Sequence, residues 1–149
     1  MFRQFLRSYT TFKVLSDSMP IMVTDSAWNK IGHILNNQPD KWGFMFSAEG
    51  GGCSGFNYSF NTIDKNEYSK IYESNSSNSN IKPSIIVNDL TQKNVKIMIE
   101  PYSEMFLLGT TIDYIKEDYA NNVFESKFVF KPNRDLATTC GCGVSFNPK

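Results

Sequence analysis

The chain has 149 residues, which fits one domain of ordinary size, and with 40% hydrophobic and 14% aromatic residues it can bury a core. Fifteen basic residues balance fifteen acidic ones. This neutrality argues against a partner such as duplex DNA, whose binding proteins usually present a basic face. The sequence contains no apolar run of about eighteen residues, so it predicts no membrane-spanning helix.

Residues 1–18 differ in composition from the rest of the chain. They carry Arg3, Arg7 and Lys13 among Phe, Leu, Ser and Thr, and the first acidic residue is Asp17. This composition is typical of a mitochondrial presequence, which is basic and amphipathic. The alternative is a disordered or strand-forming N-terminus. The segment has no long apolar centre and no small-residue cleavage site, so a secretory signal is not expected.

The apolar pattern then predicts a short strand and a helix. Residues 21–23 are apolar, and Thr24 or Asp25 can cap the helix because its side-chain oxygen can accept from the first turn. Apolar residues recur at helical spacing as far as Asn36. The Gln-Pro-Asp sequence at 38–40 ends the helix.

From Trp42 the apolar period changes to two, which is typical of a half-buried strand. Residues 56–61 alternate in the same way, and the glycine-rich stretch 49–55 separates the two runs. We therefore expect one hairpin with Cys53 at its tip. The stretch that follows, residues 65–82, is polar and cannot bury enough apolar surface to offset its ordering entropy, which predicts a flexible surface insertion.

The second half of the chain is predicted to be mostly strands. Short apolar runs indicate strands near 85–87, 95–99, 111–115 and 124–130, and a helical turn at 103–108 that ends at Gly109. Residues 137–149 contain few apolar residues, which predicts a mobile tail. The fold class expected for residues 19–149 is therefore α+β: a compact β-rich domain with one N-terminal helix and a flexible cysteine-containing C-terminal tail.

Three cysteines carry the chemistry, and their odd number does not make a disulfide framework. A disulfide between Cys140 and Cys142 would be strained, so reduced thiols are the better interpretation. The single glycine between them lets both sulfurs face one ion. Thiolates select soft metals, namely zinc, copper(I) or iron in sulfide clusters. The alternative is an exposed tail with incidental cysteines.

Cys53 has a different setting, with three glycines before it and Gly55 shortly after it. Glycines leave its sulfur unhindered and supply backbone N–H groups, which stabilise thiolate and sulfide charge. A tight turn alone explains the glycines but not the cysteine. Three thiolates are fewer than the four ligands that zinc and cubane clusters normally take. Either another group supplies the fourth ligand or two chains pool their cysteines, which predicts an oligomer that holds its metal exchangeably.

The other candidates are weaker. His33 is the only histidine and lies on the predicted helix, where a packing or surface role is more common than metal ligation. Ser54 has no histidine near it in sequence to act as a base, so we predict no catalytic residue and no enzyme. Asp113 can form hydrogen bonds at a strand end, and Glu117 and Asp118 fit a solvated turn.

Four segments together resemble one family. They are Glu-Gly-Gly-Gly-Cys-Ser-Gly-Phe-Asn-Tyr-Ser-Phe at 49–60, Ile-Asp-Tyr at 112–114, Phe-Val-Phe-Lys-Pro-Asn at 128–133 and Thr-Cys-Gly-Cys-Gly-Val-Ser-Phe at 139–146. Over residues 21–146 the chain resembles the A-type iron–sulfur carrier family, also called HesB-like or IscA-like. The first segment is most similar to the branch of the mitochondrial A-type protein of the second kind and its bacterial essential-respiration relatives.

The resemblance implies a function and a set of ligands. Cys53, Cys140 and Cys142 match the family's three cluster ligands one by one. The family's β-rich domain forms dimers or tetramers, accepts [2Fe–2S] or [4Fe–4S] clusters, and delivers them to apo-proteins. Its mitochondrial branch acts in maturation of [4Fe–4S] proteins, with a sister A-type protein and a folate-binding-fold assembly factor. This favours the mitochondrial matrix for this chain, with the cytoplasm as the alternative.

The chain departs from the family pattern in four places: the polar stretch after Tyr68, the extension at Tyr119–Val123, Arg134, and Val144. None of these removes a ligand. Three other hypotheses stay open: an iron donor that never holds a cluster, a zinc-stabilised interaction module, and an enzyme with Cys53 as nucleophile.

Overall fold

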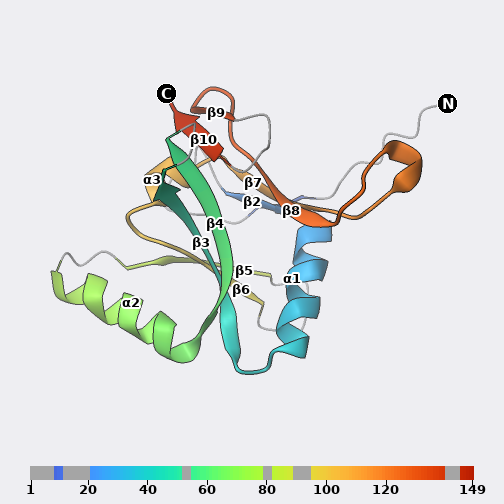
Figure 1. Ribbon diagram of the computed structural model, residues 1–149. Helices are drawn as coiled ribbons and strands as arrows, with labels where there is room; N and C mark the ends of the chain where they lie inside the picture. Colours follow the sequence, from blue (N-terminus) through green and yellow to red (C-terminus); the bar gives the residue numbers. More distant parts are fainter. Residues whose placement is uncertain (1–8, 12–20, 52–54, 79–81, 89–94, 140–144) are drawn as a thin grey trace.

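The computed structural model describes residues 9–11, 21–51, 55–78, 82–88, 95–139 and 145–149. Figure 1 shows two sheets, with helix α1 beside them and helix α2 standing apart. The elements in chain order are β1 (Tyr9–Thr11), β2 (Met22–Thr24), α1 (Asp25–Asn37), β3 (Lys41–Gly50), β4 (Phe56–Asp64), α2 (Lys65–Asn78), β5 (Ser84–Val87), β6 (Lys96–Ile99), α3 (Glu104–Leu107), β7 (Thr111–Ile115), the 3₁₀ helix η1 (Tyr119–Asn121), β8 (Lys127–Lys131), β9 (Ala137–Thr139) and β10 (Ser145–Pro148).

The described strands form two sheets, so the prediction of a β-rich α+β domain is confirmed. The first sheet has the order β1-β2-β7-β8, and the second has the order β5-β6-β3-β4-β10-β9. The hairpin of β3 and β4 is the longest ladder and runs from Lys41 opposite Asp64 to Gly50 opposite Phe56. The predicted hairpin is thus confirmed, while Cys53, which comes between the two strands in the sequence, lies outside the described residues.

Helix α1 begins and ends where the sequence predicts. Thr24 is its N-cap, and its hydroxyl oxygen accepts from the Ala27 amide at 3.2 Å. Trp28 and Ile31 lie on the buried face of the helix. Gln38 closes the helix with a backbone hydrogen bond to Leu35. The buried face holds α1 against the first sheet.

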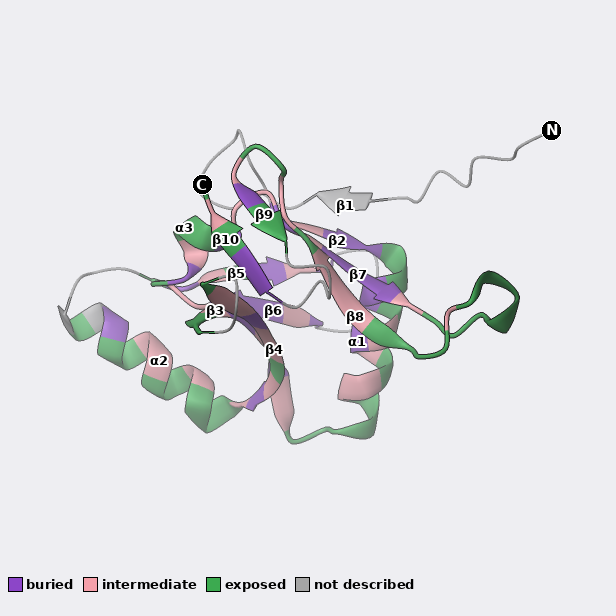
Figure 2. Ribbon diagram, turned by 45° about the horizontal axis from the view of Figure 1, so that its top comes forward, coloured by how far each residue is buried: buried purple, intermediate pink, exposed green. Residues whose placement is uncertain are grey.

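Aromatic side chains fill the space where the two sheets meet. The ring of Phe46 in β3 stacks on that of Phe130 in β8, with 5.2 Å between centroids, and Phe60 in β4 meets Phe128 edge-on at 5.0 Å. Figure 2 shows the buried residues gathered in the strands that face this core. An aromatic side chain buries roughly 150–250 Å², so these rings supply a large share of the apolar burial that joins the sheets.

Helix α2 is not predicted by the composition of residues 65–82. The reason is a reciprocal capping box: the Glu67 amide donates to Asp64 Oδ1 and the Asp64 amide donates to Glu67 Oε2, each at 2.8 Å. Tyr68 then stacks on Trp42 of β3 with ring centroids 4.1 Å apart. The start of α2 is therefore fixed by a cap and one aromatic contact. Mobility of the insertion in solution stays a prediction.

The mobile C-terminal tail is a wrong prediction for the residues that the structure describes there. Ala137–Thr139 and Ser145–Pro148 are strands β9 and β10 of the second sheet. Phe146 is fully buried, and its ring stacks on Tyr58 with centroids 4.3 Å apart. A count of apolar residues misses this because one aromatic side chain and the free edge of β4 are enough to hold the strand.

Most of the predicted presequence lies outside the described residues. Within residues 1–18 the structure describes only β1, whose backbone pairs antiparallel with β2 from Tyr9 opposite Thr24 to Thr11 opposite Met22. A strand here fits the alternative of a strand-forming N-terminus, and the presequence stays a prediction. No helix among the described residues is long and apolar enough to cross a membrane.

Candidate metal centre

The three predicted ligands, Cys53, Cys140 and Cys142, lie outside the described residues. The structure instead describes the strands on either side of them. Cys53 comes three residues before Phe56, the first residue of β4. Cys140 directly follows Thr139, the last residue of β9, and Cys142 comes three residues before Ser145, the first of β10.

The turn around Cys53 is closed by its flanking glycines. The Gly51 amide donates to the Gly55 carbonyl oxygen at 2.9 Å. Gly51 has φ of 134° and Gly55 has φ of 94°, a region that side-chain-bearing residues rarely adopt. The backbone at the two ends of the turn therefore requires these two glycines.

The described residues that flank the three cysteines share one row of the second sheet or lie next to it. Phe56 pairs with Phe146, and Phe146 pairs with Thr139 on its other side. Neighbouring strands lie about 4.8 Å apart, so Phe56 and Thr139 are separated by about 10 Å. Next to this row, Ser145 Oγ donates to Asn57 Oδ1 at 2.5 Å. Because β10 runs antiparallel to β4 and to β9, the chain leaves this row toward Cys53 in one strand direction and toward Cys140 and Cys142 in the other.

An exposed apolar surface borders the same hairpin. Tyr102, just before α3, is 69% exposed, and Met105, within α3, is 82% exposed. Phe106 stacks on Phe56 with ring centroids 4.8 Å apart, which ties α3 to the start of β4. The Ser103 hydroxyl fixes the position of α3 by accepting from the Ala48 amide at 3.0 Å.

His33 is an exposed residue of α1, where its Nε2 lies 3.3 Å from the Asn37 side-chain nitrogen. Within the described part of the chain, no group of three or more His, Cys, Asp or Glu side chains could hold a metal ion. His33 therefore has no described co-ligands. Glu117 and Asp118 are exposed on a turn, as predicted.

Asp113 has a larger structural role than its sequence context suggests. Its side chain is 1% exposed, in the middle of β7, and Oδ1 accepts from Thr24 Oγ1 at 2.7 Å and from the Tyr114 amide at 2.8 Å. Lys131 Nζ lies 3.4 Å from Oδ2. The carboxylate thus joins the α1 cap to β7 and β8. A buried carboxylate requires such partners, and only its spacing within Ile-Asp-Tyr hints at burial in the sequence.

Tyr58 is a second buried polar group in the core. Desolvation by burial raises the pKa of its hydroxyl to about 12, and hydrogen bonding with the neighbouring Thr110 side chain acts in the opposite direction. Among the described residues neither hydroxyl has a hydrogen-bond partner of good geometry. The contact between these two hydroxyls is therefore weak.

Two open grooves flank the β7–β8 ribbon. One has a volume of about 740 Å³ and is mostly apolar, and its described lining is Ile115, Val129, Phe130, Lys131, Pro132, Arg134, Ala137, Thr138, Thr139 and Lys149. The other, of about 570 Å³, is more polar and is lined by Ser26, Asn29, Lys30, His33, Tyr114, Lys116, Glu117 and Ser126. The first groove reaches Thr138 and Thr139, directly before Cys140.

A family model described as iron-sulphur cluster biosynthesis matches residues 19–144. The chain belongs to this family. It is 31% identical over 145 residues to a zebrafish (Danio rerio) protein named iron-sulfur cluster assembly 1 homolog, mitochondrial, covering 97% of this chain and 95% of the relative. It is 36% identical over 134 residues to the iron-sulfur cluster insertion protein ErpA of Delftia acidovorans, covering 86% of each.

Solved structures agree on the fold of the family. Escherichia coli SufA, involved in biosynthesis of iron-sulfur clusters, matches with a TM-score of 0.57 and 22% identity over 84% of this chain and 90% of its own. IscA with the [2Fe–2S] cluster matches with a TM-score of 0.55 and 17% identity over 85% of this chain and 96% of its own. At these identities the likeness shows the fold alone.

The resemblance to A-type, HesB-like and IscA-like proteins is therefore confirmed, and the chain is an iron–sulfur cluster assembly protein of this type. The relatives include a mitochondrial protein of the first kind and a bacterial ErpA. Assignment to the branch of the mitochondrial protein of the second kind stays a prediction. Two of the departures from the family pattern correspond to described elements, namely α2 and the extension that contains η1.

Proposed function

We propose that this chain is a carrier that holds iron, or a [2Fe–2S] or [4Fe–4S] cluster, on Cys53, Cys140 and Cys142 and transfers it to apo-proteins. The observation that supports the proposal is the row Phe56–Phe146–Thr139, which sets residues flanking the cysteines side by side in one sheet. The cluster is the cargo, and no residue of the chain is assigned a catalytic role.

The donor set suits a cargo that must be released. A free thiol titrates near pH 8.5, so holding a thiolate at pH 7 costs roughly 2 kcal/mol, which metal binding more than offsets. Three thiolates leave a four-ligand site one ligand short, so the set is completed by another molecule: a second copy, a sister A-type protein or the recipient. Replacement of that last ligand by a recipient's cysteine gives a route for transfer.

The relatives favour a mitochondrial location for the carrier. The zebrafish relative, like several other vertebrate relatives, is named as mitochondrial, while the ErpA relative is bacterial, so the cytoplasm remains the alternative. We propose that residues 1–18 form the presequence and 19–149 the carrier domain. Its recipients are then apo forms of mitochondrial [4Fe–4S] proteins, with a sister A-type protein and a folate-binding-fold factor as helpers.

Anaerobic reconstitution with iron and sulfide tests the ligand assignment. The wild-type protein is expected to become brown, with sulfide-to-iron charge-transfer absorption. Cys53→Ser, Cys140→Ser and Cys142→Ser should each lose most of this absorption, while the control His33→Ala should keep it. Colourless protein with tightly bound zinc indicates the zinc module, and bound iron without sulfide indicates the iron donor. Dependence on Cys53 alone indicates an enzyme with a cysteine nucleophile.

A second assay tests transfer. Reconstituted protein is mixed with the apo form of a [4Fe–4S] dehydratase in the presence of a chelator that captures free iron. Recovery of dehydratase activity faster than chelation supports direct transfer, and recovery only without chelator contradicts it. For the location, residues 1–19 fused to a fluorescent reporter should direct it to mitochondria, and a diffuse cytosolic signal would refute the presequence.

A further inference from the structure

The outer side of α3 is apolar and exposed. Tyr102, Met105 and Phe106 are 69%, 82% and 42% exposed, and together these three side chains form the α3 surface. Leu107 of the same helix is fully buried, so α3 is anchored on one side and open on the other. In Figure 1, α3 lies beside the end of β3, at the margin of the molecule. Exposed apolar side chains that gather in one place mark contact sites for other molecules, whereas single ones need no such explanation.

The α3 surface is held in one position by contacts with the hairpin of β3 and β4. The Ser103 hydroxyl accepts from the Ala48 amide of β3 at 3.0 Å and donates to the Glu100 carboxylate at 2.6 Å. The Phe106 ring stacks on that of Phe56 in β4, with centroids 4.8 Å apart. Because both strands of the hairpin fix α3, a partner that binds there has little ordering cost to overcome.

This end of the hairpin leads into residues 52–54, which include Cys53. The Gly51 amide donates to the Gly55 carbonyl oxygen at 2.9 Å, so the backbone closes the hairpin on both sides of these three residues. The ring against which α3 stacks belongs to Phe56, the residue directly after Gly55. The α3 surface therefore lies beside the end of the hairpin that leads into Cys53.

The charges near the α3 surface are mostly negative. Residues 97–108 contain Glu100 and Glu104 and no Lys or Arg, and Glu49 at the end of β3 is exposed. Strand β5 donates a hydroxyl hydrogen bond of 2.8 Å to Glu104, and Lys82, just before this strand, is the one basic residue of that neighbouring segment. Carboxylates therefore outnumber basic groups here, and a partner with Lys or Arg residues around an apolar contact is complementary.

We propose that the α3 surface is the docking site for the recipient apo-protein, which contacts it with an apolar surface edged by Lys or Arg residues. This inference rests on the proposed carrier function and adds the place and the chemistry of the contact. During transfer each thiolate of the recipient replaces one thiolate of the carrier, which takes up the proton that the recipient's thiol releases, and the cluster passes over whole without gain or loss of electrons. A contact beside Cys53 holds the two sets of thiols together for this exchange.

The composition of the α3 surface fits a short-lived contact. Aromatic and Met side chains are enriched where proteins meet. Three such side chains form much less than the about 1,600 Å² of a standard interface, which predicts a transient complex. A carrier that must leave its recipient after transfer requires such a complex.

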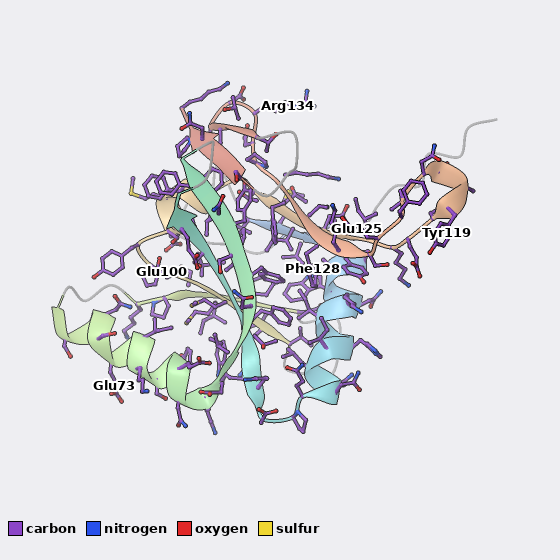
Figure 3. The ribbon with its side chains drawn as sticks, viewed as in Figure 1. Glu73, Glu100, Tyr119, Glu125, Phe128 and Arg134 are labelled. Atoms are coloured by element: carbon purple, nitrogen blue, oxygen red, sulfur yellow. The ribbon has the colours of Figure 1, made fainter. Side chains whose placement is uncertain are left out.

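Transfer kinetics test the proposal. The chain, reconstituted with iron and sulfide, is mixed with an apo recipient that takes the same cluster, namely apo-aconitase for [4Fe–4S] or an apo-ferredoxin for [2Fe–2S], with a chelator that captures free iron. Replacing Tyr102 and Met105 together by Ser should lower the second-order rate constant of transfer about fivefold or more, with the iron and sulfide content unchanged. The matched control Tyr119→Ser removes a 67% exposed ring from the extension that contains η1 and should keep the wild-type rate. Figure 3 shows Tyr119 on the opposite side of the molecule from Glu100, which lies next to the α3 surface.

Charge and contact are measured separately. Glu49→Lys reverses one charge near the α3 surface and should slow transfer about threefold or more in about 0.05 M NaCl, and less in about 0.5 M NaCl because salt screens the contact. Glu73→Lys, at an exposed position of α2, is the control and should leave the rate unchanged. The photocrosslinker p-benzoylphenylalanine should link the chain to the recipient from position 105 and not from position 119.

An unchanged transfer rate in the chain with Ser at positions 102 and 105 would overturn the docking site, and so would an equal loss in Tyr119→Ser. Sedimentation velocity of the chain with all three cysteines replaced by Ser shows whether a second copy covers the α3 surface instead. A dimer that is lost when Tyr102→Ser is added would also overturn the proposal. A wild-type chain that binds no cluster, or transfers none, contradicts the carrier function itself and the docking site with it, so the two failures are distinguishable.

Discussion

Phe146 fastens β10, the strand that follows Cys140 and Cys142 in the chain, to β4. Its side chain is fully buried and stacks on Tyr58 and Phe56, with ring centroids at 4.3 and 5.7 Å. Phe146→Ala removes a buried aromatic side chain and leaves a cavity, which costs roughly 3–5 kcal/mol of unfolding free energy. A domain is stable by about 5–15 kcal/mol, so the variant should fold with a much reduced margin.

Urea unfolding followed by circular dichroism measures this loss. With a slope near 2 kcal/mol per molar urea, the midpoint should fall by about 1.5–2.5 M. Phe124→Ala is the matched control, because it removes the same side chain from a 69% exposed position and should change stability by less than about 0.5 kcal/mol in dilute protein. A loss of unfolding free energy below about 1 kcal/mol in Phe146→Ala would refute the packing of β10 and support a mobile C-terminal tail.

Three further variants test other parts of the structure. Asp113→Ala leaves the Thr24 hydroxyl and the Tyr114 amide without this acceptor, so the unfolding free energy measured in urea should fall by about 2 kcal/mol. The exposed control Asp135→Ala should change it little, and equal effects of the two variants would contradict the buried network. Glu67→Ala breaks the α2 capping box and should cost about 1 kcal/mol of helix stability, which should appear as faster amide hydrogen exchange near Tyr68. The control Glu73→Ala in the same helix should leave this exchange unchanged, and identical exchange in the two variants would disprove the cap. The pKa of Tyr58 is about 12 in the folded chain against 10 in the unfolded chain, so the stability linked to its protonation is complete below pH 10 and is lost as the pH rises toward 12. Tyr58→Phe should therefore change the unfolding free energy little at pH 7 and should lose less stability than the wild type between pH 10 and 12. A cost above about 1.5 kcal/mol at pH 7 would mean that the hydroxyl is well bonded.

Much of the fold can be predicted from local patterns. Alternation in residues 42–47 and 56–61 predicts the hairpin, and the Thr24 cap with apolar residues at helical spacing predicts α1. Gly109 has φ of 75° after α3, as expected for the residue that ends a helix. These elements are predictable because the cause of each lies within a few residues of sequence.

Elements that depend on distant contacts are harder to predict. Strand β10 exists because β4 offers a free edge and Tyr58 offers a ring to stack on, and neither is near Phe146 in sequence. Burial of Asp113 likewise depends on Thr24, 89 residues away. Helix α2 could have been predicted locally, since Asp64 and Glu67 have the spacing of a capping box. The polar composition of residues 65–82 led instead to the prediction of a flexible insertion. For the site, the motif predicts the ligands, and the structure adds that their flanks share one row of the sheet.

The most direct test of the carrier proposal is spectroscopy of the protein purified without oxygen, combined with analysis of iron, acid-labile sulfide and zinc. Ultraviolet–visible and Mössbauer spectra should show a [2Fe–2S] or [4Fe–4S] cluster, with iron and sulfide in equal amounts and the signal absent from the protein with all three cysteines replaced by Ser. Stoichiometric zinc without sulfide, or a cluster that persists without the three cysteines, would contradict the assignment of Cys53, Cys140 and Cys142 as the ligands.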